Sequence, residues 1–296
     1  MIKWLSDVGP ADRAVDVAAR SLRSRLEAVR AYFRRAVKDP DEPENFHQLR
    51  VWTRRTESAL SLYADLLPPR KLKQLRKTLR QVRRAAGRVR DCDVFAKRIV
   101  EKGEEWPGKL RKERKTAHKK LVVLYKESGR DKRLRRQVEK LIDRLRSRNA
   151  DRTERFADRA QSAIRPLVDA FFDASPASAS DADALHKFRL AGKDLRYAME
   201  SLAPAFAPPF RDELYPTLAS LQERLGVLND LSATQERLNQ QIEKTGDPAK
   251  LSDLRRRVAA AGEETVRARE EFGKGWNPAI RDALRARFAE LSGGPG

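Results

Sequence analysis

The sequence has 296 residues, of which 40% are hydrophobic and 36% charged, and its formal net charge at pH 7 is +21. The apolar share is that of a globular protein, and the scarcity of aromatic residues and glycine favours long solvated helices over sheets. Cys92 is the single cysteine, which excludes an intrachain disulfide and predicts a small buried side chain at this position.

The first part of the chain predicts two helices. Apolar residues recur every three or four positions from 11 to 38, which is the period of one helix face. Pro40 and Pro43 then end that helix and start the next, because proline cannot continue a helix but suits its first turn. The second helix is predicted to bury one stripe of residues: Phe46, Leu49, Thr53, Thr56, Leu60 and Tyr63.

A third helix is predicted after Pro68 and Pro69, with leucines in heptad-like spacing as far as about Gly87. We predict a turn from Gly87 to Asp91, with Asp91 or Asp93 as the N-cap of a fourth helix. Residues 103–108 interrupt this helix, and a very basic segment follows over residues 109–126.

The second half of the chain is predicted to begin after residues 128–131, with one long helix over residues 132–172. A loop of alanine, serine and proline at 174–182 leads to a further helix, for which Asp183 is the predicted N-cap.

The C-terminal part of the chain is also predicted to be helical. A helix over residues 214–225 is followed by a break at residues 246–248. Asn277 and Pro278 start a last helix over residues 278–291, and residues 293–296 are predicted to be a disordered tail. No run of alternating β-branched residues is present, so the predicted fold class is all-α.

The histidine region occurs twice, because His47 and the basic residues after it return at His186, 139 positions later. The same offset relates five residues of the following helix to the second copy without a gap: Leu75, Leu79, Val82, Gly87 and Asp91 correspond to Leu214, Leu218, Leu221, Gly226 and Asp230. We therefore predict an internal duplication that yields two sequence-related four-helix bundles, residues 11–128 and 131–273, within a single domain of residues 1–296.

The two halves differ strongly in charge. Residues 1–150 contain 42 Lys and Arg and 20 Asp and Glu, a net charge of +22, whereas residues 151–296 contain 22 and 23, a net charge of −1. Such a field favours a polyanionic partner: nucleic acid, an anionic membrane surface or a phosphate polymer. Solubility alone is the simpler alternative.

Basic residues line up beside the predicted buried stripes. His47, Arg50 and Arg54 are spaced i, i+3, i+7 and share one helix face. The second copy repeats this row, and the third helix carries another; these rows are His186, Arg189, Lys193 and Arg196 or Tyr197, and Lys73, Arg76, Arg80 and Arg83. Neighbouring like charges repel, and a bound line of phosphates would compensate them. Salt bridges to acids on a neighbouring helix are the alternative for Arg50 and Arg54.

The two histidines allow two interpretations. Each could donate a hydrogen bond to a phosphate, or pair with Asp91 or Asp230 and orient an arginine. No metal-ligand spacing and no glycine-rich phosphate loop is present, so we predict neither a metal site nor a cofactor. Asp91 and Asp93 are read as helix caps rather than metal ligands, and His118 as a surface residue.

The paired motifs are His47-x-x-Arg50-x-x-x-Arg54 with Gly87-x-x-Arg90-Asp91-x-Asp93, and His186-x-x-Arg189-x-x-x-Lys193 with Gly226-x-x-Asn229-Asp230. They resemble the CHAD family, the conserved histidine α-helical domain, from about Ala11 to the last helix. The resemblance implies two four-helix bundles with pseudo-twofold symmetry, and binding of inorganic polyphosphate in a basic groove between them, without catalysis by the domain. It implies His47, Arg50, Arg54, His186, Arg189 and Lys193 as binding residues, and helical phase adds Lys73, Arg76, Arg80, Arg83 and Arg90.

The binding site is predicted to be asymmetric, because Asp212, Ala219, Gln222 and Glu223 replace Lys73, Arg80, Arg83 and Arg84 in the second copy. Some family members carry an N-terminal triphosphate tunnel metalloenzyme domain; this sequence lacks the length and the Glu-x-Glu strands for one, so a stand-alone domain is expected. We also expect a soluble cytoplasmic protein, without a signal peptide or membrane span, that associates with polyphosphate granules. The alternatives are a nucleic-acid-binding protein that uses the basic first half and an enzyme of phosphate compounds that uses a histidine.

Overall fold

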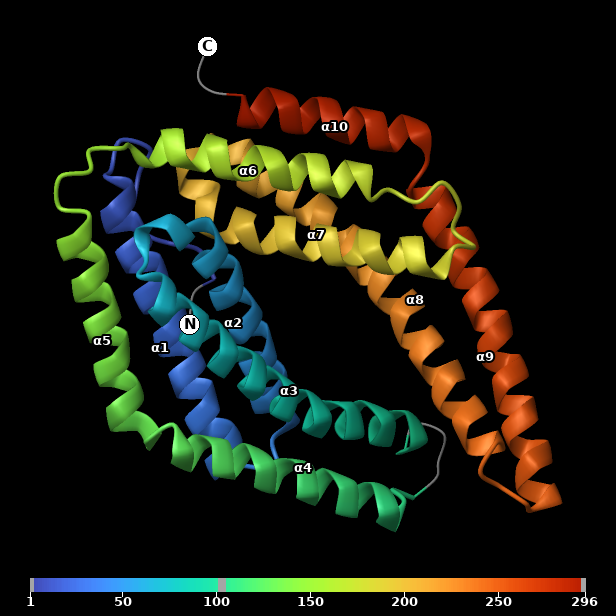
Figure 1. Ribbon diagram of the computed structural model, residues 1–296. Coiled ribbons are helices and arrows are strands. Elements are labelled where there is room, and N and C mark those ends of the chain that lie inside the picture. Colours follow the sequence, from blue (N-terminus) through green and yellow to red (C-terminus); the bar gives the residue numbers. More distant parts are fainter. Residues whose placement is uncertain (1–2, 101–104, 294–296) are drawn as a thin grey trace. The chain divides into compact units, whose positions relative to one another are not determined.

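The computed structural model describes residues 3–100 and 105–293, and these residues form ten α-helices, two short 3-10 helices and one π-helical turn, without a β-strand (Figure 1). The predicted all-α fold is therefore confirmed. No helix of the described residues combines the length and the hydropathy needed to cross a membrane. The chain divides into two compact units, Met1–Arg159 (unit 1) and Ala160–Gly296 (unit 2).

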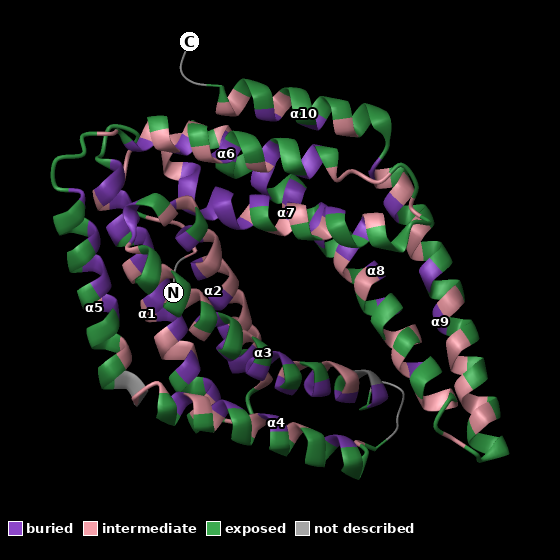
Figure 2. Ribbon diagram, viewed as in Figure 1, coloured by how far each residue is buried: buried purple, intermediate pink, exposed green. Residues whose placement is uncertain are grey.

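Unit 1 is a bundle in which α1 contacts α2 and α5, α2 contacts α3, and α3 contacts α4. Its elements are α1 (Ala14–Lys38), α2 (Pro43–Leu62), η1 (Ala64–Leu66), α3 (Pro69–Val100), α4 (Gly108–Glu127) and α5 (Arg130–Arg148). Each helix turns its apolar stripe toward the others, as the buried residues in Figure 2 show. All six residues of the stripe predicted for the second helix are fully buried in α2 or directly after it, at 0% exposure.

The start of α2 follows the prediction from its prolines. Pro43 occupies the first turn, and the side chain of Glu42 accepts a hydrogen bond of 3.0 Å from the backbone N–H of Glu44. This bond satisfies one of the N–H groups that a helix start leaves without a partner. The histidine row therefore begins one turn inside a capped helix.

The predicted turn at Gly87 is wrong, because α3 continues as one helix from Pro69 to Val100. Asp91 and Asp93 are accordingly interior residues of this helix and not N-caps. Glycine inside a helix costs only about 1 kcal/mol relative to alanine, and the adjacent Ala86 and Val89 are fully buried in the core. In unit 2, α8 (Tyr215–Ile242) likewise runs through Gly226. Tertiary packing thus outweighs the local signal for a turn.

The predicted division at residues 128–131 coincides with a tight turn between α4 and α5. Gly129 adopts φ +81°, a left-handed conformation that favours glycine. The apolar side chains of α5, including Leu141 and Leu145, join the same core as α1 and α2. The helix predicted over residues 132–172 is therefore two helices, α5 and α6 (Phe156–Asp173), and the compact units divide at Arg159 and Ala160.

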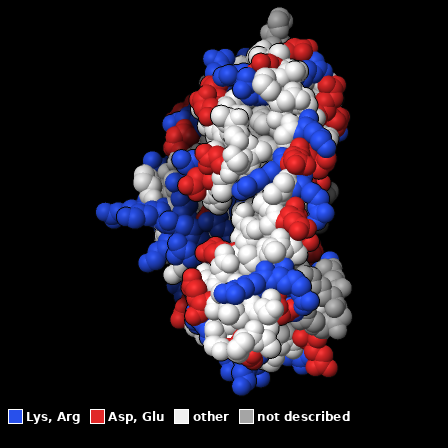
Figure 3. All heavy atoms as spheres, turned by 90° about the vertical axis from the view of Figure 1, so that its right-hand side faces the viewer, with Lys and Arg blue, Asp and Glu red and all other residues white. Residues whose placement is uncertain are grey.

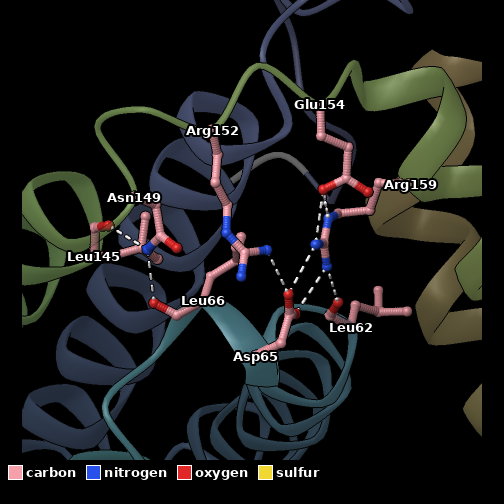
Figure 4. A network of polar contacts seen from close by, with 8 residues as sticks. All are labelled: Leu62, Asp65, Leu66, Leu145, Asn149, Arg152, Glu154 and Arg159. Carbon is pink, nitrogen blue, oxygen red and sulfur yellow. Dashed lines mark hydrogen bonds and ion pairs between the residues drawn. The ribbon is translucent and has the colours of Figure 1, made fainter.

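A polar network holds the segment between α5 and α6 against η1 (Figure 4). Asp65 accepts two hydrogen bonds of 2.9 Å from Arg159 and one of 3.1 Å from Arg152. The side-chain amide of Asn149 donates to the carbonyls of Leu66 and Leu145. Burial works to raise the pKa of Asp65, but the hydrogen bonds and charge of Arg159 and then the charge of Arg152 outweigh it and lower the pKa. The chain between the two helices is thus anchored to unit 1.

The order of elements in unit 2 is that of unit 1 with the π-helical turn η3 added. After α6 come α7 (Ala182–Leu202), η2 (Ala203–Ala205), the π-helical turn η3 (Phe210–Leu214), α8, α9 (Pro248–Gly275) and α10 (Pro278–Ser292). The 139-residue offset carries the bounds of η1 onto those of η2. Asp181 caps α7, in place of the predicted Asp183, by accepting a 2.9 Å hydrogen bond from Ala184 N–H. Residues 294–296 of the predicted disordered tail lie outside the described residues.

Candidate functional site

The predicted basic row lies on one side of α2. Helical spacing places His47, Arg50 and Arg54 beside the buried stripe, and all three side chains are half-buried. Their apolar neighbours Phe46 and Leu49 are fully buried in the core. The core therefore fixes the rotation of α2 and with it the direction of the row.

The row faces along α3, which runs antiparallel to α2. Arg50 lies opposite Asp91, with 3.9 Å between Nη1 and Oδ1. Arg83 forms an ion pair with Glu57 of α2, and Arg76 donates a 3.0 Å hydrogen bond to the hydroxyl of Ser61. These contacts tie the two helices together, so that the α2 and α3 rows form one surface, which we call the α2–α3 face.

Gly87 makes room for Arg50 on this face. A Cβ atom at position 87 would lie 2.1 Å from Nη1 of Arg50. The guanidinium group therefore occupies the space that any larger residue on α3 would fill. From the sequence we predicted Gly87 as a turn residue. In the structure, the missing side chain at Gly87 leaves space for Arg50 between the helices.

His47 lies in a strongly positive environment. Burial is the main factor that lowers its pKa below the ordinary value of 6.5; Glu44 works against this effect, and the charges of Arg90, Arg50 and Arg54 lower the pKa further. The charge of Arg90 on α3 thus acts on the histidine row of α2. The lowered pKa favours the neutral form of the imidazole in the protein without a bound anion.

The cations of α3 far outnumber the acids near them. Residues 70–90 contain ten Lys and Arg, and the sequence has no Asp or Glu from Leu66 to Arg90. Arg83 is neutralised by Glu57. Other predicted site residues form no ion pair among the residues that the structure describes: Lys73, Arg76, Arg80 and Arg90 of α3, and Arg54 of α2. Figure 3 shows Lys and Arg side chains gathered in one region of the surface, with both signs of charge mixed over the rest.

The second row of predicted site residues lies on α7 in unit 2. His186 is exposed, and Arg189 and Lys193 are half-buried. Arg196 is engaged within the unit: it donates a 2.9 Å hydrogen bond to the Tyr215 hydroxyl and lies 3.4 Å from the carboxylate of Glu200.

Two predicted site residues of unit 2, Arg196 and Tyr197, make contacts inside the unit. Tyr197 is only 4% exposed, and the guanidinium of Arg196 lies over its ring. Glu200 is fully buried and accepts a 2.6 Å hydrogen bond from Tyr215, whose pKa is raised to about 12, first by burial and then by the charge of Glu200. Arg196 compensates the charge of the buried Glu200, and burial of that acid without a cation would be costly.

The same positions of the two units carry different chemistry. The pair Ser61 and Arg76 in unit 1 corresponds at the 139-residue offset to Glu200 and Tyr215 in unit 2, and both pairs are hydrogen-bonded. Arg83 corresponds to Gln222, whose amide lies over Gly192 in the interior of unit 2. The helix contacts are thus similar, but unit 2 has Tyr215 and Gln222 where unit 1 has the cations Arg76 and Arg83.

No group of three or more His, Cys, Asp or Glu side chains among the described residues could hold a metal ion. The prediction of a surface position for His118 is wrong, because its ring is half-buried, with Nε2 3.1 Å from the carbonyl oxygen of Ala36. Cys92 is buried, as predicted.

Comparison with known proteins identifies the family. A family model described as CHAD domain matches residues 17–239, which is most of the chain. The chain belongs to the CHAD family. No protein with curated annotation matches the sequence.

Two solved structures share the CHAD fold of this chain. The crystal structure of the CHAD domain from the plant Ricinus communis is 21% identical, with a TM-score of 0.69, over 97% of this chain and 95% of the other. PptA from Streptomyces chartreusis is 19% identical, with a TM-score of 0.56, over 90% of this chain and 99% of the other. With 97% of this chain covered, the first likeness extends beyond residues 17–239, which the family model matches.

Proposed function

We propose that this CHAD protein binds inorganic polyphosphate without catalysis, and that the α2–α3 face of unit 1 is the main contact. The observation that carries the proposal is the set of α3 cations that have no acid partner among the described residues: Lys73, Arg76, Arg80 and Arg90. Arginine holds phosphate oxygens in a bidentate geometry, and charge-assisted hydrogen bonds are stronger than neutral ones. Family membership supports the same ligand class. The row of His186, Arg189 and Lys193 on α7 would add weaker contacts.

The absence of exposed rings favours a phosphate polymer over nucleic acid. Proteins that bind single strands stack bases on accessible aromatic side chains. In the part of the chain that the structure describes, no Phe, Tyr or Trp is more than partly exposed, and Trp52 and Tyr63 beside the basic row are buried in the core. A polymer of phosphate alone needs no such platform.

Calorimetry with long-chain polyphosphate and with duplex DNA, at the same salt concentrations, tests the proposal. Both affinities should fall with salt, because counterion release accompanies the binding of any polyanion. We expect clearly tighter binding of polyphosphate at every salt concentration. Equal affinities would contradict polyphosphate as the specific ligand, and release of phosphate during the titration would contradict binding without catalysis.

Association with polyphosphate granules in cells is part of the proposal. A fluorescent fusion should accumulate at granules, and a variant with Arg50, Arg54, Arg189 and Lys193 replaced by alanine should spread through the cell. Equal accumulation of the two proteins would show that these cations do not direct the association.

Polyphosphate binding should strengthen as the pH falls, because the bound anion offsets the arginine charges that lower the pKa of His47. Between the lowered pKa of the free protein and the higher pKa of the complex, binding takes up a proton. Affinity should rise by at most about tenfold per pH unit in this window and level off below it. Calorimetry in buffers of different ionisation enthalpy counts the protons. His47→Gln should reduce the uptake; an unchanged count would assign the proton to another group.

Replacement of Gly87 by alanine should weaken polyphosphate binding without unfolding the protein. The new Cβ displaces the guanidinium of Arg50, while alanine itself suits a helix. Loss of one charge contact of about 1 kcal/mol corresponds to about fivefold in affinity. Gly226→Ala is the matched control, because a Cβ at position 226 meets no atom within 4 Å. An equal effect of both substitutions would contradict the role assigned to Arg50.

A further inference from the structure

A second site candidate lies in unit 1, away from the α2–α3 face. A cavity of about 460 Å³ is bounded by α1, α3, α5 and the end of α4. It exists because α3 and α5 each pack along other helices and leave a gap between themselves over α1. Its volume is within the range of small-molecule sites, about 300–1,000 Å³.

The floor of this cavity is apolar. Phe33 and Val29 of α1 lie in it, with Leu75 of α3, Leu134 of α5 and Leu124 of α4 along its sides. The three leucines are only partly buried, although they pack against the main core of the unit. An alkyl chain in the cavity would remove their remaining surface from water, which is favourable in proportion to the apolar area.

The rim of the cavity is cationic. Lys71 of α3 and three cations of α5, Arg133, Lys140 and Arg144, lie along it, and Glu127 is the acid that lines it. Among the described residues none of these four cations forms an ion pair, whereas a fifth cation of the lining, Arg30, is paired with Glu27 at 2.7 Å. The rim therefore offers uncompensated positive charge next to an apolar floor.

From this arrangement we propose that the cavity binds a single-chain amphiphilic anion, with its alkyl chain on the apolar floor and its anionic head group at the cationic rim. Polyphosphate does not fit this chemistry, because it has no apolar part to cover the leucines.

Calorimetry with decyl phosphate, below its micelle concentration, tests this proposal. We expect saturable binding of one molecule per chain, with inorganic phosphate and decyltrimethylammonium at least tenfold weaker, since each lacks one of the two matching parts. Circular dichroism during the titration should show an unchanged helix content. Non-saturable binding, or equal binding of the cationic surfactant, would overturn the proposal.

Two variants assign the binding to the cavity. Gln137→Trp places a large side chain into the cavity from an exposed position of α5, and should weaken decyl phosphate binding at least tenfold without a change in polyphosphate affinity. Replacement of Lys71, Lys140 and Arg144 by glutamine should remove the preference for the anionic head group.

A variant with Lys115, Lys119 and Lys126 replaced by glutamine is the matched charge control. Unchanged binding in both cavity variants, or tighter binding of an acidic amphipathic peptide than of decyl phosphate, would overturn it.

Discussion

Replacement of Arg114 by alanine should lower the free energy of unfolding of unit 1 by about 3–5 kcal/mol, the cost of leaving a buried charge without its partner. Arg114 of α4 contacts Asp93 of α3, with 2.5 Å between Nε and Oδ1, and donates a 2.7 Å hydrogen bond to the carbonyl of Pro40. Its guanidinium also lies 5.5 Å from the ring centre of Phe46. The substitution would leave Asp93, whose side chain is only 4% exposed, as an uncompensated buried acid.

The pKa of Asp93 supports this expectation. Burial raises it above the ordinary value even though Arg114 and Arg90 work against the shift. Denaturant unfolding followed by circular dichroism and tryptophan fluorescence measures the effect. Arg111→Ala is the matched control, because Arg111 is exposed and its main contact is the face of Trp106; it should change stability by less than about 0.5 kcal/mol.

The double variant Asp93→Leu/Arg114→Met separates the pair from its surroundings. Replacing both charged partners by apolar residues of similar volume is often nearly neutral, so this variant should recover most of the lost stability. A loss below about 1 kcal/mol for Arg114→Ala would show that Asp93 finds other compensation. A double variant as unstable as the single one would place the effect in the hydrogen bond to Pro40 instead.

Simultaneous replacement of Arg54, Arg80 and Arg90 by alanine should weaken polyphosphate binding by about 100-fold, with the fold intact. Among the described residues none of the three is held by an acid, so their charge is available to a ligand. At about 1 kcal/mol per contact, the three together correspond to a factor of about 100. The slope of log K against log salt should fall by about three, since fewer counterions are displaced.

A charge-matched variant shows whether position matters. Lys115, Lys119 and Lys126 are exposed on α4, and replacing them by alanine removes the same charge from the same unit. This control should lose less than about threefold in affinity at moderate salt. Equal losses in the two triple variants would mean that polyphosphate is attracted by the net charge of unit 1 and not by the α2–α3 face.

The two halves of the chain differ in charge, with +22 in residues 1–150 and −1 in residues 151–296. The 139-residue offset relates helix contacts that differ in charge, as between Arg76 with Ser61 and Tyr215 with Glu200. Two units can share their helix packing while only one of them carries unpaired cations, because the core depends on the apolar stripe and the ligand on the adjacent row. We therefore expect ligand-binding substitutions in unit 1 to have the larger effects.

Several features could be predicted from the sequence alone because they depend on neighbours within two helical turns. The period of apolar residues predicted α1 and α2, Pro43 predicted the start of α2, and Asn277 and Pro278 the start of α10. The same period placed His47, Arg50 and Arg54 on one row beside the buried stripe. Local spacing determines these features, since a helix presents residues three and four apart on the same face.

Only the tertiary structure decided which charges have partners. Arg83 is neutralised by Glu57 and Asp93 by Arg114, residues 26 and 21 positions away, and Arg50 occupies space that Gly87 leaves open on α3. A turn was predicted at Gly87 because glycine is a weak helix former. In the structure, burial of the flanking residues keeps α3 continuous. The spacing of apolar residues predicts which face of a helix carries a side chain. The order and register in which the helices pack determine which residues that side chain contacts.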